Sequence, residues 1–265
     1  MSFYTDKVIW VTGASSGIGL AFVEYVNKVG AKVILSSRKV TELEKVKSNL
    51  THPQNAFVLP LDLEKFENFD ELTINAIKAF GHIDILINNG GISQRSLASE
   101  TKVEVDERLM KINYLGTVAL TKAVLPHMLK RKSGAIYTVS SMVGKFGTPY
   151  RSAYAATKHA LHGFMDSLRA EVFEDGIHIG MICPGFVNTN VSKNALTGDG
   201  SALGKMDAAT ADGIEPIVFA ARMASAIEQS REEVYIAGAK EKFGLFMKRF
   251  FPSLFNKLIR KMAVR

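Results

Sequence analysis

Three side chains in the middle of the sequence have the types and spacing of a proton-transfer site. Tyr154 and Lys158 are four residues apart, so in a helix they lie on the same face. A free tyrosine has a pKa of about 10, but an ammonium group close to it stabilises the phenolate and lowers that pKa. Ser141 could hydrogen-bond a substrate oxygen on which negative charge develops. A phenol tuned in this way can give a proton to a carbonyl oxygen or take one from an alcohol.

A glycine-rich turn near the start of the sequence predicts an anion-binding loop. The run Thr12-Gly13-Ala14-Ser15-Ser16-Gly17-Ile18-Gly19 follows an apolar stretch and leads into a segment of helical period. Backbone N–H groups at a helix N-terminus bind negative charge, and glycines let a pyrophosphate approach the backbone. The run lacks the Gly-Lys-Ser/Thr ending of a nucleoside triphosphatase loop, so we predict a dinucleotide site.

The same run also contains the Gly-x-Ser-x-Gly pattern of serine hydrolases, with Ser15 as the nucleophile. In that class a loop earlier in the chain supplies part of the oxyanion hole, and only twelve residues precede Gly13. We therefore disfavour a hydrolase. A serine hydrolase would instead be indicated if a serine-directed phosphonate labelled Ser15 and abolished activity.

The pair of residues that follows the second apolar run predicts which dinucleotide binds. A unit that binds NAD usually has an acid about 20 residues beyond the glycines, where it bonds the ribose 2′-hydroxyl. Here that place is taken by Ser37 and Arg38, and the next acid is Glu42. Because a guanidinium binds a 2′-phosphate that a carboxylate would repel, we predict NADP(H), with Arg38 as the main discriminator and Ser37 assisting. The alternative is that Arg38 is an ordinary solvated residue.

The elements that must position these residues alternate along the chain. Short runs rich in Val and Ile predict buried parallel strands, and the segments between them have helical period, so we expect an α/β fold with helices on both faces of one sheet. The stretch 190–206 has no clear period and is predicted to be a loop over the substrate. The predicted strands are Val8–Thr12, Lys32–Ser36, Ala56–Leu61, Ile83–Asn88, Gly134–Ser140, Ile177–Cys183 and Glu233–Ile236, and the predicted helices lie near 18–29, 39–50, 66–80, 104–131, 151–174 and 207–230.

Three glycines or a Tyr-x-x-x-Lys pair alone are weak signals, but the motifs occur together and in a set order. On this combination the sequence resembles the short-chain dehydrogenases/reductases from about Val8 to Ile236. The resemblance implies a single Rossmann-type, doubly wound parallel sheet with strand order 3-2-1-4-5-6-7. One departure is Gly90, where the family usually has alanine. The motifs are Thr12-Gly13-x-x-x-Gly17-x-Gly19, Asp62, Asn88-Asn89-Gly90-Gly91, Asn113, Ser141, Tyr154-x-x-x-Lys158 and Pro184-Gly185-x-x-x-Thr189.

The resemblance also implies a role for each matching residue. Tyr154 would be the general acid/base, Lys158 would lower its pKa and bind the nicotinamide ribose, Ser141 would orient the substrate carbonyl, and Asn113 would support a water chain to Lys158. No metal is expected. The implied cofactor-binding residues are Thr12, Gly13, Ser15, Ser16, Gly17, Ile18, Gly19, Ser37, Arg38, Asp62, Leu63, Asn89, Gly90, Gly91, Tyr154, Lys158, Pro184, Gly185, Val187 and Thr189, and the implied substrate residues are Ser141, Gln94, Val143, Tyr150 and Phe186.

Within the family the sequence is most similar to the branch of the 11β-hydroxysteroid dehydrogenases and the dehydrogenase/reductase member 7 proteins. That likeness implies an NADP(H)-dependent oxidoreductase acting on a lipophilic carbonyl or secondary alcohol, such as a steroid or retinoid. Reduction of a 3-oxoacyl thioester is the alternative substrate chemistry. A non-catalytic dinucleotide sensor or scaffold is the alternative of another class. The family resemblance further implies a homodimer or homotetramer formed through the helices of 104–131 and 151–174.

The charge of the chain is concentrated at its C-terminal end. The segment 240–265 carries the whole net charge of +7, because it has eight basic residues and a single acid, Glu241. Segment 1–239, the predicted catalytic domain, is therefore neutral, which disfavours a nucleic-acid-binding body. Apolar residues recur every three or four positions in the basic segment, which predicts one or two amphipathic helices joined at Pro252 that either lie on an anionic membrane or pack on protein. These apolar residues are Phe243, Phe246, Met247, Phe250, Phe251, Leu254, Phe255, Leu258, Ile259 and Met262.

The composition is that of a globular chain of 265 residues, with 47% hydrophobic and 22% charged residues. One cysteine, Cys183, excludes a disulfide framework. No apolar run approaches the ~20 residues of a membrane-spanning helix, and the early start of the first strand leaves no space for a signal peptide. We therefore expect a cytoplasmic protein, and the amphipathic basic segment adds peripheral contact with a membrane as an alternative. A small-molecule substrate is implied by the family resemblance.

Overall fold

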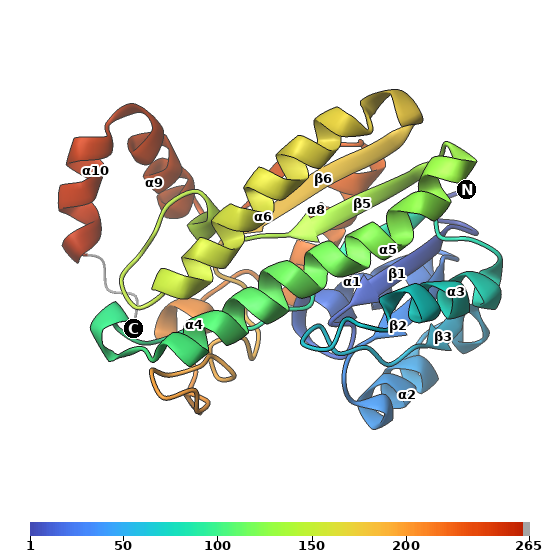
Figure 1. Cartoon of the computed structure of the whole chain (residues 1–265), viewed down its shortest axis with the longest axis horizontal. Helices are drawn as coiled ribbons and strands as arrows, with labels where there is room; N and C mark the ends of the chain where they lie inside the picture. The colour runs from blue at the N-terminus through green and yellow to red at the C-terminus, as the bar shows by residue number, and fades with distance from the viewer. Residues whose placement is uncertain (262–265) are drawn as a thin grey trace.

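The structure is a computed structural model, and it describes residues 1–261. Its centre is a sheet of seven parallel strands in the order β3-β2-β1-β4-β5-β6-β7, as the sequence predicted (Figure 1). The predicted α/β fold with a Rossmann-type strand order is thus confirmed. The strands are β1 (Val8–Thr12), β2 (Lys32–Ser36), β3 (Ala56–Val58), β4 (Ile85–Asn88), β5 (Gly134–Val139), β6 (Ile177–Pro184) and β7 (Glu233–Ile236).

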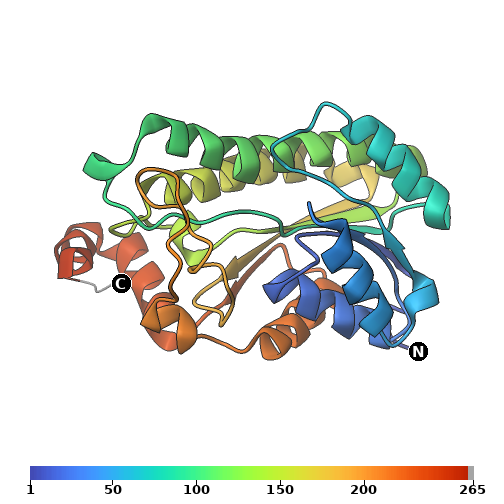
Figure 2. The ribbon, with the colours of Figure 1, turned by 90° about the horizontal axis from the view of Figure 1, so that it is seen from below.

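Helices cover both faces of the sheet (Figure 2). Alternate residues of β1 point to opposite faces of the sheet. Ile9 and Val11 pack with α1, α2 and α8 on one face. Val8 and Trp10 pack with α3, α5 and α6 on the other. Both faces of the strand are therefore buried, which accounts for its unbroken apolar sequence. The helices are α1 (Gly17–Lys28), α2 (Val40–Asn49), α3 (Phe69–Phe80), α4 (Val103–Met110), α5 (Gly116–Arg131), α6 (Ser152–Glu171), α7 (Ala208–Ala211), α8 (Pro216–Glu228), α9 (Ala239–Phe250) and α10 (Pro252–Leu258).

Two predicted helices are divided in the structure. Segment 104–131 forms α4 and α5, separated by a turn of π-helix over Lys111–Leu115. Segment 207–230 forms the short α7 and then α8, which begins at Pro216. Gly213 lies between them against the loop after β6, where a Cβ atom would come within 2.7 Å of the Phe186 carbonyl carbon. Proline is favoured in the first turn of a helix, so the division occurs where the sequence places Gly213 and Pro216.

The predicted loop 190–206 has no helix or regular strand, but it is bound to the segment that follows β4. Its Leu196 N–H donates to the Ser93 carbonyl at 2.9 Å, and the Arg95 N–H donates to the Leu196 carbonyl at 2.8 Å. Leu196 also forms an isolated bridge with Gln94. These backbone bonds place the loop beside the carboxyl ends of the strands, where ligands bind in open α/β sheets.

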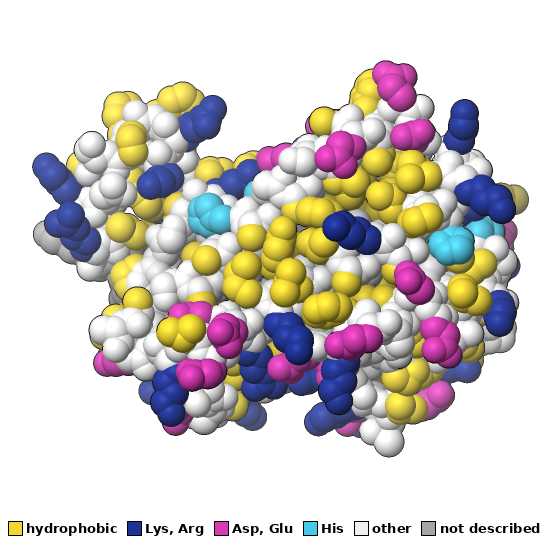
Figure 3. Space-filling model, in the orientation of Figure 1, with side chains coloured by type: hydrophobic (Ala, Val, Ile, Leu, Met, Phe, Trp, Pro, Cys, Tyr) yellow, Lys and Arg dark blue, Asp and Glu magenta, His cyan; other side chains and the backbone are white. Residues whose placement is uncertain are grey.

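The basic segment forms two helices joined at Pro252, as predicted, and part of its apolar face packs on the body. Met247 and Phe255 are buried in a cluster with Met142, Phe146 and Cys183. The remaining face is open, and hydrophobic and basic side chains lie close together on it (Figure 3). Its exposed apolar residues are Phe243, Phe246, Phe250, Phe251, Leu254 and Leu258, while the predicted Met262 lies outside the described residues. Among residues 1–261, no helix combines the length and apolar character needed to cross a membrane.

Candidate active site

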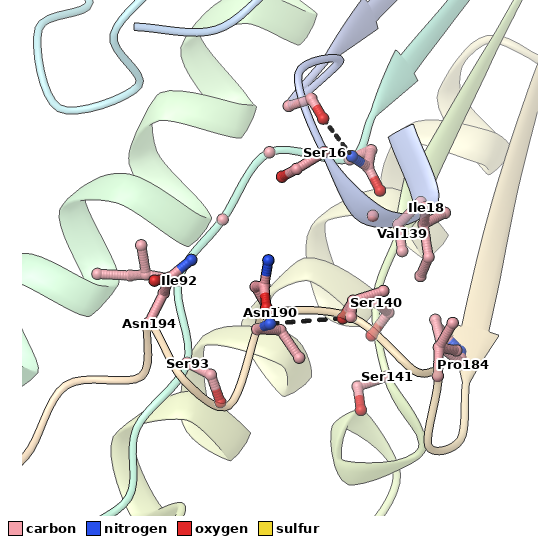
Figure 4. A pocket seen from close by; sticks show the side chains of 18 of the residues that line it. Ser16, Ile18, Ile92, Ser93, Val139, Ser140, Ser141, Pro184, Asn190 and Asn194 are labelled. Atoms are coloured by element: carbon pink, nitrogen blue, oxygen red, sulfur yellow. Dashed lines mark hydrogen bonds between the residues drawn. The ribbon is translucent and has the colours of Figure 1, made fainter. Parts of the chain in front are cut away.

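One cavity of about 220 Å³ brings the three proposed catalytic residues together. Ser141 ends the extended chain after β5, and Tyr154 and Lys158 project from the first two turns of α6. Figure 4 shows Ser141 beside Pro184 at the end of β6, with Ser16 of the glycine loop on another side of the same cavity, so three separate segments surround one opening. The site lies at the carboxyl ends of the strands, where the sequence analysis placed it.

The N-terminus of α6 is held by a side chain from the segment after β4. Gln94 Oε1 accepts hydrogen bonds from the N–H groups of Ala153 at 2.9 Å and Tyr154 at 3.2 Å. Its Nε2 donates to the hydroxyls of Ser96 and Thr101. These bonds satisfy N–H groups that a helix start leaves without partners. Gln94 is completely buried and positions Tyr154 in this structure, and its predicted contact with substrate stays a prediction.

Lys158 is anchored to the sheet rather than to the tyrosine oxygen. Its Nζ donates to the Val139 carbonyl at 2.9 Å and lies 5.7 Å from the centre of the Tyr154 ring. Burial disfavours the ammonium form and lowers the pKa of Lys158 to about 8. The proposed proton-transfer pair is therefore brought together, with the ammonium below the ring.

The pKa of Tyr154 differs from the sequence-based expectation. Burial raises it, whereas the positive charges of Arg151 and Arg95 and the hydrogen bond of Ser141 lower it, and burial has the largest effect. We expected a pKa lowered by Lys158. In this structure the lowering charges are two arginines that the sequence analysis did not consider, and the phenol is held in its protonated form.

Asn113 lies in the π-turn between α4 and α5 and is almost fully buried. Its side chain forms a two-way bridge to Ile92: Oδ1 accepts from the Ile92 N–H at 2.8 Å, and Nδ2 donates to the Ile92 carbonyl at 2.9 Å. Nδ2 also lies 3.2 Å from Thr157 Oγ1 on α6. A Cβ atom on Gly91 would meet both Asn113 Oδ1, at 2.9 Å, and Lys158 Nζ, at 3.9 Å. Asn113 and Lys158 thus both lie against Gly91, and π-turns are frequent at functional sites.

The glycine loop is shaped for close contact with a ligand. Gly13 and Gly17 have φ values of +66° and +56°, a region that side chains rarely adopt. A Cβ atom on Gly19 would lie 2.3 Å from the Gly13 carbonyl oxygen. The Thr12 hydroxyl accepts from the N–H groups of Asn89 and Gly90, at 3.0 and 2.9 Å, and so braces the loop against the end of β4. The N-terminus of α1 is left open toward the cavity.

A second cavity of about 520 Å³ continues from the first around the glycine loop. The two share Gly13, Ser16, Gly90 and Gly91. Ser37 Oγ is buried here without a hydrogen-bond partner among residues 1–261, and the exposed Arg38 lies beside it. A buried hydroxyl without a partner fits a site that a polar ligand completes. The joined cavities therefore fit an extended dinucleotide.

Most of the predicted residues line these cavities, and a few do not. Val143 is buried, and its N–H donates to Ser141 Oγ at 3.3 Å, so it supports the serine in this structure, while its predicted contact with substrate stays a prediction. The first cavity contains Gly13, Ser16, Gly17, Ile18, Asn89, Gly90, Gly91, Ser141, Tyr154, Lys158, Pro184, Gly185, Val187 and Thr189. The second contains Thr12, Gly13, Ser15, Ser16, Ser37, Arg38, Asp62, Leu63, Gly90 and Gly91. Neither is lined by Gly19, Asn113, Gln94, Val143, Tyr150 or Phe186.

Behind the site, His162, Cys183 and Glu233 place three possible metal ligands within 4.8 Å of one another. The Glu233 carboxylate is already used, because it forms an ion pair with Lys145 at 2.6 Å and accepts from the Tyr235 hydroxyl. Burial raises the pKa of Cys183 to about 12, so its thiol stays protonated. A protonated thiol and a neutralised carboxylate are poor metal ligands.

Comparison with known proteins agrees with this geometry. The family profile described as "short chain dehydrogenase" matches residues 7–200. "Dehydrogenase/reductase SDR family protein 7-like" from Anopheles gambiae is 44% identical to this chain, over 97% of this chain and 83% of that protein. The chain belongs to the short-chain dehydrogenase/reductase family. As a member of that family it is an oxidoreductase that binds a nucleotide cofactor.

Other relatives identify the branch of the short-chain dehydrogenases/reductases. "Dehydrogenase/reductase SDR family member 7B" from Mus musculus is 38% identical, over 99% of this chain and 83% of that protein. A short-chain dehydrogenase from Streptomyces avermitilis has a matching structure, with a TM-score of 0.83 at 28% identity over 99% of this chain and 100% of that chain. The predicted likeness to the member 7 branch is confirmed.

The buried lysine gives this short-chain dehydrogenase/reductase a pH-dependent stability. Below pH 8, Lys158 is charged in the folded and unfolded states, and folding pays the full cost of burying the charge. Between pH 8 and 10.5, Lys158 is deprotonated in the folded state but still protonated in the unfolded state. The free energy of unfolding therefore rises by roughly 3 kcal/mol across this range. Lys158→Met should remove this rise, which urea unfolding across this pH range would measure. Lys122→Met, on the exposed face of α5, should keep it, and parallel curves for wild type and Lys158→Met would contradict the prediction.

Proposed function

We propose that this chain catalyses NADP(H)-dependent hydride transfer between the nicotinamide ring and a carbonyl or secondary alcohol. The observation that carries the proposal is the single cavity in which Ser141, Tyr154 and Lys158 face the glycine loop and Thr189. A catalytically silent dinucleotide-binding protein would not need a partly buried tyrosine and serine and a buried lysine around the same opening. We therefore favour an enzyme over a sensor or scaffold.

In the direction of reduction, the residues of the chain deliver and stabilise one proton. When bound, the cofactor supplies the hydride for reduction or accepts it in oxidation. The Ser141 hydroxyl donates to the substrate oxygen as negative charge develops, and Tyr154 transfers its hydroxyl proton to that oxygen. Lys158 then stabilises the phenolate that remains, and Asn113 holds Gly91 and Ile92 beside the ammonium. In oxidation the phenolate takes the proton of the alcohol.

We propose a lipophilic substrate because apolar side chains share the cavity with the catalytic groups. Ile18, Ile92, Val187 and Val191 line it. Val191 belongs to loop 190–206, whose backbone bonds to residues 93–95 place it over the cavity. An apolar body with a carbonyl directed at Ser141 and Tyr154 suits this lining.

Replacement of the proposed general acid tests the function directly. Tyr154→Phe removes the transferable proton while keeping the ring, so kcat/KM for any ketone should fall at least ~100-fold. The Kd for NADPH should change little, because the glycine loop is unaffected. NADPH oxidation with a panel of ketones and NADPH fluorescence titration measure the two quantities. Tyr25→Phe, on α1 away from both cavities, is the matched control, and unchanged turnover by Tyr154→Phe would refute the assignment.

The preference for NADP(H) is proposed from the residues at the end of β2. Arg38 presents an exposed guanidinium and Ser37 a buried hydroxyl, and Glu42 is the carboxylate of α2 that lines the same cavity. Charge-assisted hydrogen bonds to a 2′-phosphate are strong. The attraction of that phosphate by Arg38 should therefore exceed its repulsion by the exposed Glu42.

Arg38→Asp should therefore reduce the NADPH-to-NADH ratio of kcat/KM at least ~10-fold, since a hydrogen bond to a charged group contributes about 1.5–3 kcal/mol. Steady-state kinetics with both cofactors measure the ratio. Lys45→Asp makes the same change of charge on an exposed position of α2 and should leave the ratio as in the wild type. An unaltered ratio in Arg38→Asp would show that another group discriminates.

We further propose that the chain forms a homodimer or homotetramer through α5 and α6. Apolar side chains gather over these helices in Figure 3. Leu115 is 45% exposed, and Tyr114 and Phe164 are only partly buried. A long, continuous apolar face of this kind is typical of a subunit interface.

For the open face of α9 and α10 we propose peripheral contact with an anionic membrane. Phe246, Phe250 and Phe251 form one aromatic cluster, with ring centres 4.9 and 6.1 Å from Phe246. Basic residues surround it, among them the exposed Arg249 and Lys257. Aromatic groups beside cations are typical of helices that lie in a lipid interface.

Co-sedimentation with phosphatidylserine vesicles tests this contact. The wild type should bind at low salt and bind less at high salt, because part of the attraction is electrostatic. Phe246→Asp combined with Phe250→Asp should abolish binding. Phe173→Asp changes an exposed phenylalanine elsewhere on the surface and should leave binding intact. No binding of the wild type at any salt concentration would rule out the membrane contact.

A further inference from the structure

Two arginines and one aspartate form a buried ionic cluster next to the catalytic tyrosine. Arg95, from the segment after β4, donates through Nε and Nη2 to Asp207 Oδ2 at 2.9 and 2.8 Å. Its Nη1 donates to Ser93 Oγ and to the Gln94 carbonyl, both at 2.8 Å. The other oxygen of Asp207 accepts from the Thr210 N–H at 2.8 Å. Arg95 and Asp207 thus satisfy each other almost completely.

Arg151, the second arginine, has no such partner. Its side chain is 8% exposed, and its Nε and Nη2 atoms are buried without a hydrogen-bond partner in the part of the chain that the structure describes. The nearest carboxylate oxygen is Asp207 Oδ2, at 4.0 Å from Nη2, which already accepts two bonds from Arg95. The guanidinium lies over the ring of Phe186, at 5.2 Å from its centre. The cluster therefore contains two cations and one anion.

A buried guanidinium whose N–H groups lack hydrogen bonds is costly, so Arg151 requires an explanation although it shares Asp207 with Arg95 at 4.0 Å. Burial and the charge of Arg95 lower the pKa of Arg151 to about 10, which leaves it protonated at neutral pH. A stack on Phe186 stabilises the flat face of a guanidinium but does not satisfy its N–H groups. Those groups fit an anion with two oxygens in one plane, because a guanidinium donates to such an anion through two parallel bonds.

The cluster lies just behind the wall of the catalytic cavity: Arg95, Arg151 and Asp207 do not line that cavity, but residues bonded or adjacent to them do. Arg151 immediately precedes α6, three residues before Tyr154, and its charge lowers the pKa of that phenol. Ser93, which bonds Arg95, lines the catalytic cavity (Figure 4). Phe186, below the guanidinium, is flanked by Gly185 and Val187 of the same cavity. The residue before Arg151, Tyr150, has a φ of +66°, a costly conformation for a non-glycine residue that is retained at a defined position.

We propose that Arg151 is a specificity-determining residue that binds an anionic group of the substrate, a carboxylate or a phosphate. The substrate is then a carbonyl compound, or the corresponding alcohol, with an apolar portion and one acidic end. Reduction at the carbonyl proceeds as above, and the acidic end takes no part in the chemistry. This inference rests on the proposed function for its kinetic consequence, but the anion site itself does not depend on catalysis.

The kinetic experiment compares matched ketones that differ in charge. Short-, medium- and long-chain oxo acids are tested against their methyl esters, and a ketone with a phosphate monoester against its neutral alcohol. For the wild type, kcat/KM of the best anionic ketone should exceed that of its neutral partner at least ~10-fold, as expected for bonds to a charged group. In Arg151→Met this ratio should fall to about one, and Arg151→Lys, which keeps the charge, should retain part of it. The exposed Arg222→Met on α8 is the matched control.

A second measurement needs no turnover. With NADPH bound, so that the glycine loop is occupied, inorganic phosphate and acetate are added separately and Tm is recorded. The wild type should gain Tm with at least one of them, and Arg151→Met should not; the more effective anion indicates the substrate's acidic group. Wild-type kinetics that favour the neutral ketone at every chain length, or equal Tm gains in the wild type and Arg151→Met, would overturn the proposal. If no ketone is reduced but the Arg151-dependent Tm gain is present, the proposed function fails and the anion site stands.

Discussion

The active site depends on how the first turns of α6 are fixed to the sheet. One amide oxygen, Gln94 Oε1, holds two N–H groups at the helix start, and one turn later Lys158 donates to the Val139 carbonyl of β5. A helix fixed at these two points cannot rotate or slide. Tyr154, between them, is therefore held over the end of β5, where Ser141 begins the next turn. Precise placement of reacting groups contributes a large part of catalytic rate.

Electrostatics at Tyr154 reflect a competition between burial and nearby cations. Burial alone favours the neutral phenol, which is the form that gives a proton. Arg151, Arg95 and the Ser141 hydroxyl oppose it, and Lys158 lies against the same ring. The net effect raises the pKa of Tyr154, which favours the protonated phenol that the proposed mechanism requires. Whether each neighbouring group raises or lowers the pKa of Tyr154 depends on where the fold places that group. The four-residue spacing of Tyr154 and Lys158 carries no information about this.

The fold was predictable from sequence because its strands are continuous apolar runs and its motifs follow those runs. Residues after parallel strands meet at one edge of the sheet, so Ser141, Asn89 and the glycine loop were placed correctly in one site. The buried ionic cluster of Arg95, Arg151 and Asp207 was not predictable in this way. Arg95 and Asp207 are 112 residues apart in sequence, and their contact depends on how loop 190–206 lies on the segment after β4. Likewise the buried role of Gln94 follows from tertiary contacts and leaves no pattern in its own segment.

The π-turn at Lys111–Leu115 changes the register between two helices that would otherwise be one. In α4, Val105 and Leu109 pack against Ala153 and Leu196, whereas α5 packs on the sheet. Each residue of an α-helix advances the side-chain direction by about 100°. Deletion of one residue in the turn would therefore restore a regular helix at the expense of one of these two surfaces. The number of residues between α4 and α5 is consequently fixed. Insertion or deletion of even one residue in this turn is far less tolerable than a substitution.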